Sequence, residues 1–312
     1  MAKLIITGGC GFIGSHLTEL LLSKGHEIII IDNLSAGYKS NIDLNNSAIT
    51  FFESSVESFD LYSLRDVNGV FHLAAQASVP YSINNFYESS STNVLSTLKV
   101  IDFCSKEKIP MVYATSSAVY GNLPFGDENG DIELLSPYAA DKYIIELYTS
   151  VAFKLYGLRS FGLRFFNVYG PRQDPKNPYS GVISLFADKL IKGEPITING
   201  GYQTRDFIFV KDVAYCIYES YLYLLKNEAA KISNVLTGNS ISIDDLVGHL
   251  SHILNVVPEC KYVDLPAGDP ESSLGATGVI EDLLNLRCNN FLNIEAGLRQ
   301  TIDYIKKETE GI

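Results

Sequence analysis

The sequence is short of positive charge and has no regular cysteine spacing. Lys and Arg number 24 against 36 Asp and Glu, which gives a formal net charge of -12. An acidic surface gains nothing from a polyanion, so we expect neither nucleic acid nor an anionic membrane as a partner. The five cysteines are scattered, without a Cys-x-x-Cys pair, at Cys10, Cys104, Cys216, Cys260 and Cys288. This pattern argues against a disulfide framework and against a zinc site, and we predict no metal.

Long apolar runs are absent as well. No run approaches the roughly 18 residues that a membrane-spanning helix needs. The first eight residues contain only three consecutive apolar side chains, Leu4, Ile5 and Ile6, which is too short for the core of a signal peptide. We therefore expect a cytoplasmic protein.

The chain begins with a pattern of strand, glycine-rich turn and helix. Residues 4–7 form a short, mostly apolar run, residues 8–14 contain four glycines, and leucines recur at helical spacing over residues 15–22 before Gly25. In this context the glycines let the turn tighten and let a pyrophosphate approach the backbone, while the helix N-terminus faces the phosphates. The pattern predicts a dinucleotide-binding site.

A carboxylate follows the second apolar run. Residues 28–31 are apolar and end at Asp32, eighteen positions after Gly14. A carboxylate at this place can accept hydrogen bonds from the adenosine ribose hydroxyls and repel a 2′-phosphate, which favours NAD over NADP. The alternative on these residues alone is a glycine-rich loop in an unrelated α/β protein, with Asp32 as a helix cap.

Apolar runs and helical patterns alternate along the first half of the chain. Further apolar runs cover residues 49–52, 69–73, 110–115 and 159–166, and helical patterns cover about 83–108 and 138–157. This alternation predicts an α/β fold with a Rossmann-type doubly wound parallel sheet. Ligands of such sheets gather at the carboxyl ends of the strands, where Asp32, Ser116 and Asn167 fall.

The composition changes after residue 170. Four prolines follow within a short stretch, at Pro171, Pro175, Pro178 and Pro195, and we predict a domain boundary there. Residues 1–170 would form an NAD-binding domain, to which a segment near 201–226 returns. Residues 171–312 would form a smaller, mixed α/β domain for the substrate.

Tyr138 and Lys142 are the first candidates for catalysis. Four residues apart on a helix, they share a face, so the ammonium can lie near the phenol and lower its pKa. An unperturbed phenol titrates near ~10, too high for a base at neutral pH. Ser116 would steer a reacting hydroxyl towards the phenol oxygen. The alternative for Tyr138 and Lys142 alone is an ordinary pair on a helix surface.

Six motifs, in this order along the chain, resemble the extended short-chain dehydrogenase/reductase family and, within it, the nucleotide-sugar epimerases. They are residues 7–14 (TGGCGFIG), 32–35 (DNLS), 72–75 (HLAA), Ser116 with Tyr138 and Lys142, 163–173 (LRFFNVYGPRQ) and 203–207 (QTRDF). The resemblance covers residues 4 to about 300.

The resemblance implies NAD as the cofactor and a nucleotide sugar as the substrate. It assigns to NAD the residues Gly8, Gly11, Phe12, Ile13, Gly14, Asp32, Asn33, Ser35, Ser55, Val56, Leu73, Ala74, Ala75, Asn93, Tyr138, Lys142 and Phe166. It assigns to the substrate the residues Ser116, Asn167, Val182, Thr197, Asn199, Arg205, Asp269 and Ser273. Arg205 would pair with the diphosphate, because a planar and permanently charged guanidinium suits that contact.

The resemblance also implies a mechanism in which Ser116, Tyr138 and Lys142 are catalytic. Tyr138 would take the proton of the sugar 4-hydroxyl while C4 delivers a hydride to NAD. The keto sugar would turn over in the site and receive the hydride on its opposite face. No net redox change results, so NAD is expected to stay bound as a prosthetic group.

The details favour one branch of this family. Family dehydratases carry an Asp-Glu pair after the residue that matches Ser116, whereas this chain has Ser117 and Ala118. Residues 172–175 and 178–183 are similar to those of bacterial UDP-N-acetylglucosamine 4-epimerases. Ser273 matches a gate residue beside the sugar, where a small side chain leaves room for an N-acetyl group.

Three positions depart from the family pattern. Ser55 replaces an acidic residue near the adenine, Pro266 stands where a second diphosphate-binding arginine is usual, and Ala276 stands near an expected acid. These departures leave open whether the nucleotide is UDP. Lys261 and Arg287 are candidates to replace the missing cation.

The residues and the resemblance together predict a 4-epimerase of UDP-hexoses, most of all UDP-N-acetylglucosamine and UDP-N-acetylgalactosamine, with UDP-glucose and UDP-galactose as further substrates. Another nucleotide-sugar epimerase or an oxidoreductase, acting on a uronic acid or 6-deoxy sugar, is the nearest alternative. A non-catalytic NAD-binding sensor or scaffold is the alternative of another class. The helical patterns at 83–108 and 138–157 have more apolar positions than one sheet face needs, so we expect a homodimer through them, with burial in a monomer as the alternative.

Overall fold

A seven-stranded parallel sheet is the centre of the first lobe. The computed structural model describes residues 1–177, 180–265 and 270–310, and its large sheet has the strand order β10-β6-β5-β4-β1-β2-β3. Its strands are β1 (Lys3–Thr7), β2 (Glu27–Asp32), β3 (Ile49–Glu53), β4 (Gly69–His72), β5 (Met111–Ser116), β6 (Ser160–Phe165) and β10 (Ala230–Val235). The predicted doubly wound parallel sheet is confirmed.

Both faces of this sheet are buried by helices, which is why its strands read as apolar runs. Successive residues of a strand point to opposite faces: Leu4 and Ile6 pack in the core under α1 (Phe12–Ser23), α7 (Val210–Lys226) and α9 (Gly278–Leu284). Ile5 packs in the core under α4 (Ser96–Glu107) and α5 (Pro137–Tyr156) on the other face.

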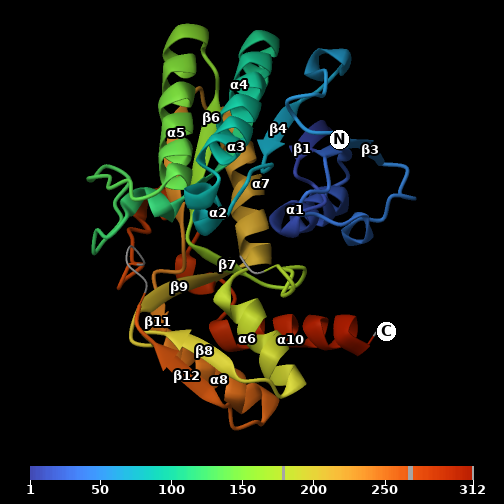
Figure 1. Ribbon diagram of the computed structural model, residues 1–312. Helices are drawn as coiled ribbons and strands as arrows, with labels where there is room; N and C mark the ends of the chain where they lie inside the picture. Colours follow the sequence, from blue (N-terminus) through green and yellow to red (C-terminus); the bar gives the residue numbers. More distant parts are fainter. Residues whose placement is uncertain (178–179, 266–269, 311–312) are drawn as a thin grey trace.

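The second lobe has two small sheets and a core of its own. One sheet joins β11 (Ser240–Ser242), β9 (Thr204–Phe209) and β7 (Asn167–Tyr169), and the other joins β12 (Cys260–Val263) and β8 (Ile196–Asn199). The helices α6 (Val182–Lys192), α8 (Ile243–Leu254) and α10 (Ile294–Glu310) pack around them. Figure 1 shows this lobe below the large sheet, with the C-terminal end of α10 at its side.

The chain crosses between the lobes more often than a single boundary near residue 170 describes. The segment near 201–226 was expected to return to the NAD-binding domain. Its helix α7 packs on the large sheet, whereas its strand β9 belongs to the three-stranded sheet of the second lobe. After α7 the chain adds β10 beside β6 in the large sheet, a strand that the sequence pattern did not place there. The addition covers β6, which would otherwise be an open sheet edge.

The predicted helix over 83–108 is divided. The segment consists of α2 (Val79–Asn84), α3 (Phe86–Ser90), a π-helical turn at Ser91–Leu95 and α4. Short 3-10 turns occur at Lys39–Asn41, Leu61–Ser63, Ser117–Tyr120 and Cys288–Asn290. In the described part of the chain, no helix combines the length and the apolar character that crossing a membrane requires.

Candidate active site

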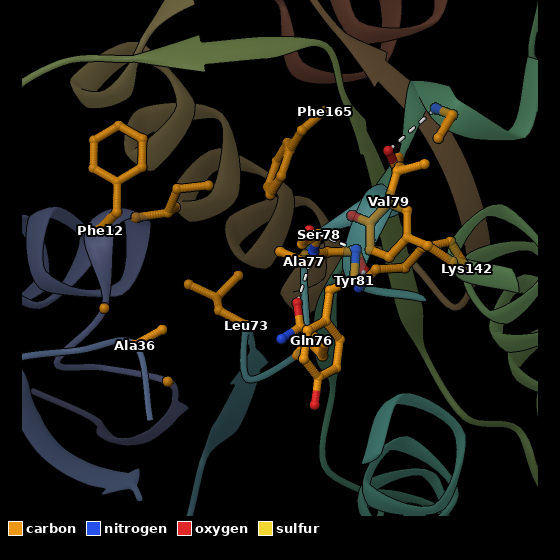
Figure 2. Close-up of a pocket in the computed structure, with 18 of the residues that line it drawn as sticks. Phe12, Ala36, Leu73, Gln76, Ala77, Ser78, Val79, Tyr81, Lys142 and Phe165 are labelled. Carbon is orange, nitrogen blue, oxygen red and sulfur yellow. Dashed lines mark hydrogen bonds between the residues drawn. The ribbon is translucent and has the colours of Figure 1, made fainter. Parts of the chain in front are cut away.

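A cavity of 1840 Å³ runs along the carboxyl edge of the large sheet and reaches the second lobe. The strand order places β1 between β2 and β4, where the winding direction of the sheet reverses and a crevice opens. Figure 2 shows Phe12 and Ala36 at one end of the view, Lys142 at the other, and Leu73 between them. The cavity therefore connects the glycine-rich turn with the predicted catalytic residues.

The glycine-rich turn is packed so closely that side chains do not fit. A Cβ on Gly14 would lie 2.1 Å from the carbonyl oxygen of Gly8, and a Cβ on Gly8, which has a φ of +74°, would lie 2.8 Å from the amide nitrogen of Ala74. Both glycines line the cavity just where α1 begins. A backbone cradle at a helix N-terminus suits a pyrophosphate, so these residues fit NAD.

Asp32 is the last residue of β2 and caps no helix. Its Oδ2 accepts a hydrogen bond from the Cys10 amide at 2.9 Å, and its Oδ1 accepts one from the Leu34 amide at 2.8 Å. The carboxylate thereby holds the glycine-rich turn against the following loop, and it also lines the cavity. Its position at the second strand end is the one at which adenosine ribose hydroxyls are bound in this fold.

Ser116, Tyr138 and Lys142 meet on the cavity wall. Ser116 ends β5, while α5 begins at Pro137 after the cap Ser136, whose Oγ accepts a hydrogen bond from the Ala139 amide. The ammonium of Lys142 donates to the carbonyl oxygen of Ala114 at 3.0 Å and lies 5.7 Å from the centre of the Tyr138 ring.

The pKa of Tyr138 is shifted by its surroundings in the protein. Burial raises it above the ordinary value, and the hydrogen bond with Ser116 lowers it only in part. Burial also lowers the pKa of Lys142 to about 8, against the opposing charges of Asp141 and Glu146. Lys142 is not among the groups that shift this pKa, so the expected depression of the phenol pKa by Lys142 and a cationic cofactor ring stays a prediction for the protein with NAD bound.

Nearly all the residues assigned to NAD line this cavity; Asn93 does not. Asn93 is buried, its Oδ1 accepts a hydrogen bond from the Gln76 amide, and its Nδ2 donates to the Gln76 carbonyl and to Asp141. It supports Gln76, which does line the cavity. From this segment Ser91 and Thr92, in the π-helical turn, and Ser96, at the start of α4, line the wall.

Only some of the residues assigned to the substrate line the cavity. Ser116, Asn167, Asn199, Arg205 and Ser273 line the cavity. Val182 and Thr197 do not: Val182 packs against the core of the second lobe, and Thr197 is exposed on β8. Asp269 and Pro266 lie outside the described residues.

Two cations of the cavity wall were not predicted. Lys261 and Arg287 are exposed and do not line it, whereas Arg172 and Lys176 do. The signal in the sequence is the Gly-Pro-Arg that directly follows β7, and its arginine, Arg172, has a φ of +69°. Arg172 forms an ion pair with Glu19 of α1, so it also joins the two lobes.

Comparison with known proteins places this geometry in a family. The model of the NAD dependent epimerase/dehydratase family matches residues 4–235. The chain belongs to this family. It is thus an NAD-dependent enzyme, as the glycine cradle and Asp32 indicate, and the predicted resemblance is confirmed.

Several relatives share nearly the whole chain. A protein of Methanocaldococcus jannaschii, described provisionally as a UDP-glucose 4-epimerase, is 40% identical over 83% of this chain and 85% of its own. The UDP-N-acetylglucosamine 4-epimerase from Methanobrevibacter ruminantium M1, solved with UDP-N-acetylmuramic acid, is 35% identical with a TM-score of 0.92, covering 98% of this chain and 99% of that one. The UDP-glucose 4-epimerase of Thermus thermophilus, solved with NAD, is 31% identical with a TM-score of 0.87, covering 97% and 99%.

Proposed function

We propose that this protein is a 4-epimerase that interconverts UDP-N-acetylglucosamine and UDP-N-acetylgalactosamine, and that it also accepts UDP-glucose and UDP-galactose. One observation carries the proposal: Ser116, Tyr138 and Lys142 meet on the wall of the cavity that contains the glycine cradle. Its volume of 1840 Å³ exceeds what a single small ligand fills, since such pockets measure roughly 300–1,000 Å³, and it suits a dinucleotide together with a nucleotide sugar.

Tyr138 is the proton acceptor and donor in this proposal. Its phenol takes the proton of the sugar 4-hydroxyl and later returns it, while Ser116 hydrogen-bonds to the phenol and orients the hydroxyl. NAD, when bound, supplies the reversible hydride acceptor for C4. Lys142 places a positive charge beside the ring, which stabilises the phenolate as the proton is transferred.

The diphosphate of the substrate would lie near Arg205. Arg205 lines the part of the cavity built by the second lobe, as do Asn199 and Ser273. Lys176 also lines this wall and supplies a cation in place of the arginine that the family has at the position of Pro266, whereas the charge of Arg172 is paired with Glu19. We assign residues 1–170, with the returning segment near 201–226, to the NAD-binding domain, and residues 171–312 otherwise to the domain for the sugar nucleotide.

Two features support an N-acetylated sugar. Ser273 is small, lines the cavity, and accepts a hydrogen bond from Asn167 at 3.3 Å, so this wall leaves room beside the sugar. The relative from M. ruminantium was solved with an N-acetylated UDP-sugar in place. Dehydration is disfavoured, because Ser117 and Ala118 lack the carboxylates that would expel the 6-hydroxyl.

A homodimer in the cytoplasm completes the proposal. On α5, Leu147, Val151 and Leu155 form an exposed apolar stripe, and Phe86 and Tyr87 of α3 are exposed as well. Figure 1 shows α4 and α5 side by side as two long helices at one side of the large sheet. A second copy that pairs through these helices would bury these exposed apolar side chains, and an exposed apolar patch of this kind is typical of protein–protein interfaces.

The test is incubation of the purified protein with UDP-N-acetylglucosamine, followed by separation of the product sugars, with Tyr138→Phe as the matched control. Formation of the C4 epimer by the wild type alone supports the proposal. Release of NADH in proportion to substrate would indicate an oxidoreductase, and turnover only of UDP-glucuronate or a 6-deoxy precursor would indicate another sugar. Bound NAD without turnover of any of these would indicate a sensor or scaffold.

A further inference from the structure

A buried polar network extends from the catalytic helix to β10, the edge strand of the large sheet. Glu146 lies one turn after Lys142 on α5, and its carboxylate accepts hydrogen bonds from Arg164 at 3.0 and 2.6 Å and from Thr115 at 2.7 Å. Both charged side chains are buried in the protein. A buried pair of this kind is tolerated only when its remaining hydrogen-bonding groups have partners as well.

Those further partners lead to Asn234, the fifth residue of β10. Nη1 of Arg164 donates to the Tyr120 hydroxyl at 2.8 Å, and this hydroxyl donates to Oδ1 of Asn234 at 2.7 Å. Asn234 is fully buried, with a relative exposure of 0%. Its side chain is thus held on one side by a chain of hydrogen bonds that begins on the catalytic helix.

On its other side, Asn234 holds the wall segment, by which we mean residues 270–276. Nδ2 of Asn234 donates to the carbonyl oxygens of Gly126 and Ala276 at 3.0 and 3.2 Å. Gly126 in turn exchanges backbone hydrogen bonds with the wall segment, donating to Leu274 at 2.8 Å and accepting from Ala276 at 2.9 Å. One amide group therefore bridges both members of this short backbone pairing.

The wall segment is packed without spare space. A Cβ on Gly275 would lie 2.7 Å from the Phe166 ring, 3.0 Å from the Gly126 carbonyl oxygen and 3.2 Å from Nδ2 of Asn234. Phe166, Ser273 and Leu274 all line the cavity. A shift at Gly275 would therefore move the surface that the sugar contacts.

We propose that Asn234 is a positioning residue for substrate specificity, which fixes the wall segment, and with it Ser273, relative to the catalytic helix. The proposal rests on the proposed function in so far as the ligand at this wall is the sugar. Asn234 does not line the cavity itself. It acts through the wall segment, whose distance from Tyr138 decides how much room the group on the sugar ring has.

The test uses the full-length protein with its bound NAD and three variants. Asn234→Ala removes the bridging amide, and Tyr120→Phe removes the hydroxyl that connects Asn234 to Arg164 while it keeps the ring that lines the cavity. Thr149→Val is the matched control, because Thr149 is also buried and bonds the Tyr113 hydroxyl at 2.7 Å, away from the wall segment. Thermal unfolding of each variant shows that it is folded; if Asn234→Ala is not, Tyr120→Phe decides the test.

The functional measurement is kcat and KM for UDP-N-acetylglucosamine and UDP-glucose. Loss of the bridge should raise KM more than it lowers kcat. The ratio of kcat/KM for UDP-N-acetylglucosamine to kcat/KM for UDP-glucose should change by about fivefold towards one, which is the effect expected from the loss of one hydrogen bond. Thr149→Val should leave both KM values and the ratio unchanged. Variants whose KM values and ratio stay within about twofold of the wild type would overturn the proposal.

Hydrogen exchange tests the anchoring without any substrate. In Asn234→Ala and Tyr120→Phe, the amides of Gly126 and Ala276 should exchange faster than in the wild type and in Thr149→Val. Unchanged protection there would overturn the proposal even if the enzyme is a 4-epimerase. If the wild type turns over neither sugar, the proposed function fails by itself, and the exchange result still decides whether Asn234 holds the wall segment.

Discussion

Lys142→Met should make the protein more stable while it abolishes turnover. The ammonium is buried, and its pKa is lowered from 10.5 to about 8. A difference of about 2.5 pKa units corresponds to about 3 kcal/mol, by which the folded state disfavours the charged form at pH 7. Loss of the hydrogen bond to the Ala114 carbonyl reduces this gain in stability by about 1 kcal/mol. The net gain is about 2 kcal/mol in the free energy of unfolding, or roughly 4 °C in Tm.

The pH dependence of stability tests the direction of this prediction. At pH 7 Lys142 is charged in both the folded and the unfolded state, so the folded protein bears the whole cost. As the pH rises through about 8, the folded protein loses this proton while the unfolded chain keeps it up to about 10.5. The stability of the wild type should therefore approach that of Lys142→Met between pH 8 and 10.5.

The assay is urea unfolding of both proteins at pH 7 and pH 9.5, together with Tm at each pH. NAD is removed first, because a ligand that binds only the folded state adds its own stabilisation. The other titrating groups are common to the two proteins, so the difference between them reports on Lys142. A variant that is less stable than the wild type at pH 7, or a difference that does not shrink at pH 9.5, would refute the reasoning.

Three other predictions follow from the site and its surroundings. Tyr138→Phe should keep its fold and bound NAD but lose about 10²–10⁴ in kcat, the share of general acid-base catalysis; turnover at the wild-type rate would remove Tyr138 from the mechanism. Gly14→Ala, whose Cβ would lie 2.1 Å from a backbone oxygen, should purify without NAD, whereas Gly248→Ala on α8, with no atom within 4 Å, should keep NAD, as absorbance and released nucleotide will show. Leu147→Glu should convert the proposed dimer to a monomer in light scattering, and a wild-type protein that is already monomeric would contradict the proposal.

The sequence alone was sufficient for those parts of the site that depend on residues close together in the chain. The turn at residues 8–14 and the carboxylate at Asp32 were predictable, because a strand, a tight glycine turn and a helix follow one another and only glycine fits the close approach of Gly14 to Gly8. Tyr138 and Lys142 could be placed on one helix face from their spacing alone. Parallel strands carried Asp32, Ser116 and Asn167 to a single edge.

What the sequence could not give is which neighbour a residue meets. Asn93 has the right sequence neighbourhood for the cofactor cleft, yet its side chain bonds Gln76 and Asp141 and does not line the cavity. Val182 begins α6 and Thr197 lies within β8, and their distance from the cavity follows from the packing of the second lobe. The burial that raises the Tyr138 pKa was equally out of reach, because spacing along a helix contains no information on burial.

Sequence by itself determined the family, the sheet, the glycine-rich turn and the shared helix face of Tyr138 and Lys142, since these follow from motifs, short-range periodicity and glycine sterics. Only the tertiary structure decided that β10 pairs with β6, that Arg172 and Lys176 line the cavity in addition to Lys142 and Arg205, and that Asn234 bonds the wall segment and, through Tyr120, Arg164. The reason is physical: these contacts join residues far apart in the chain, and their distances are set by how the two lobes pack together.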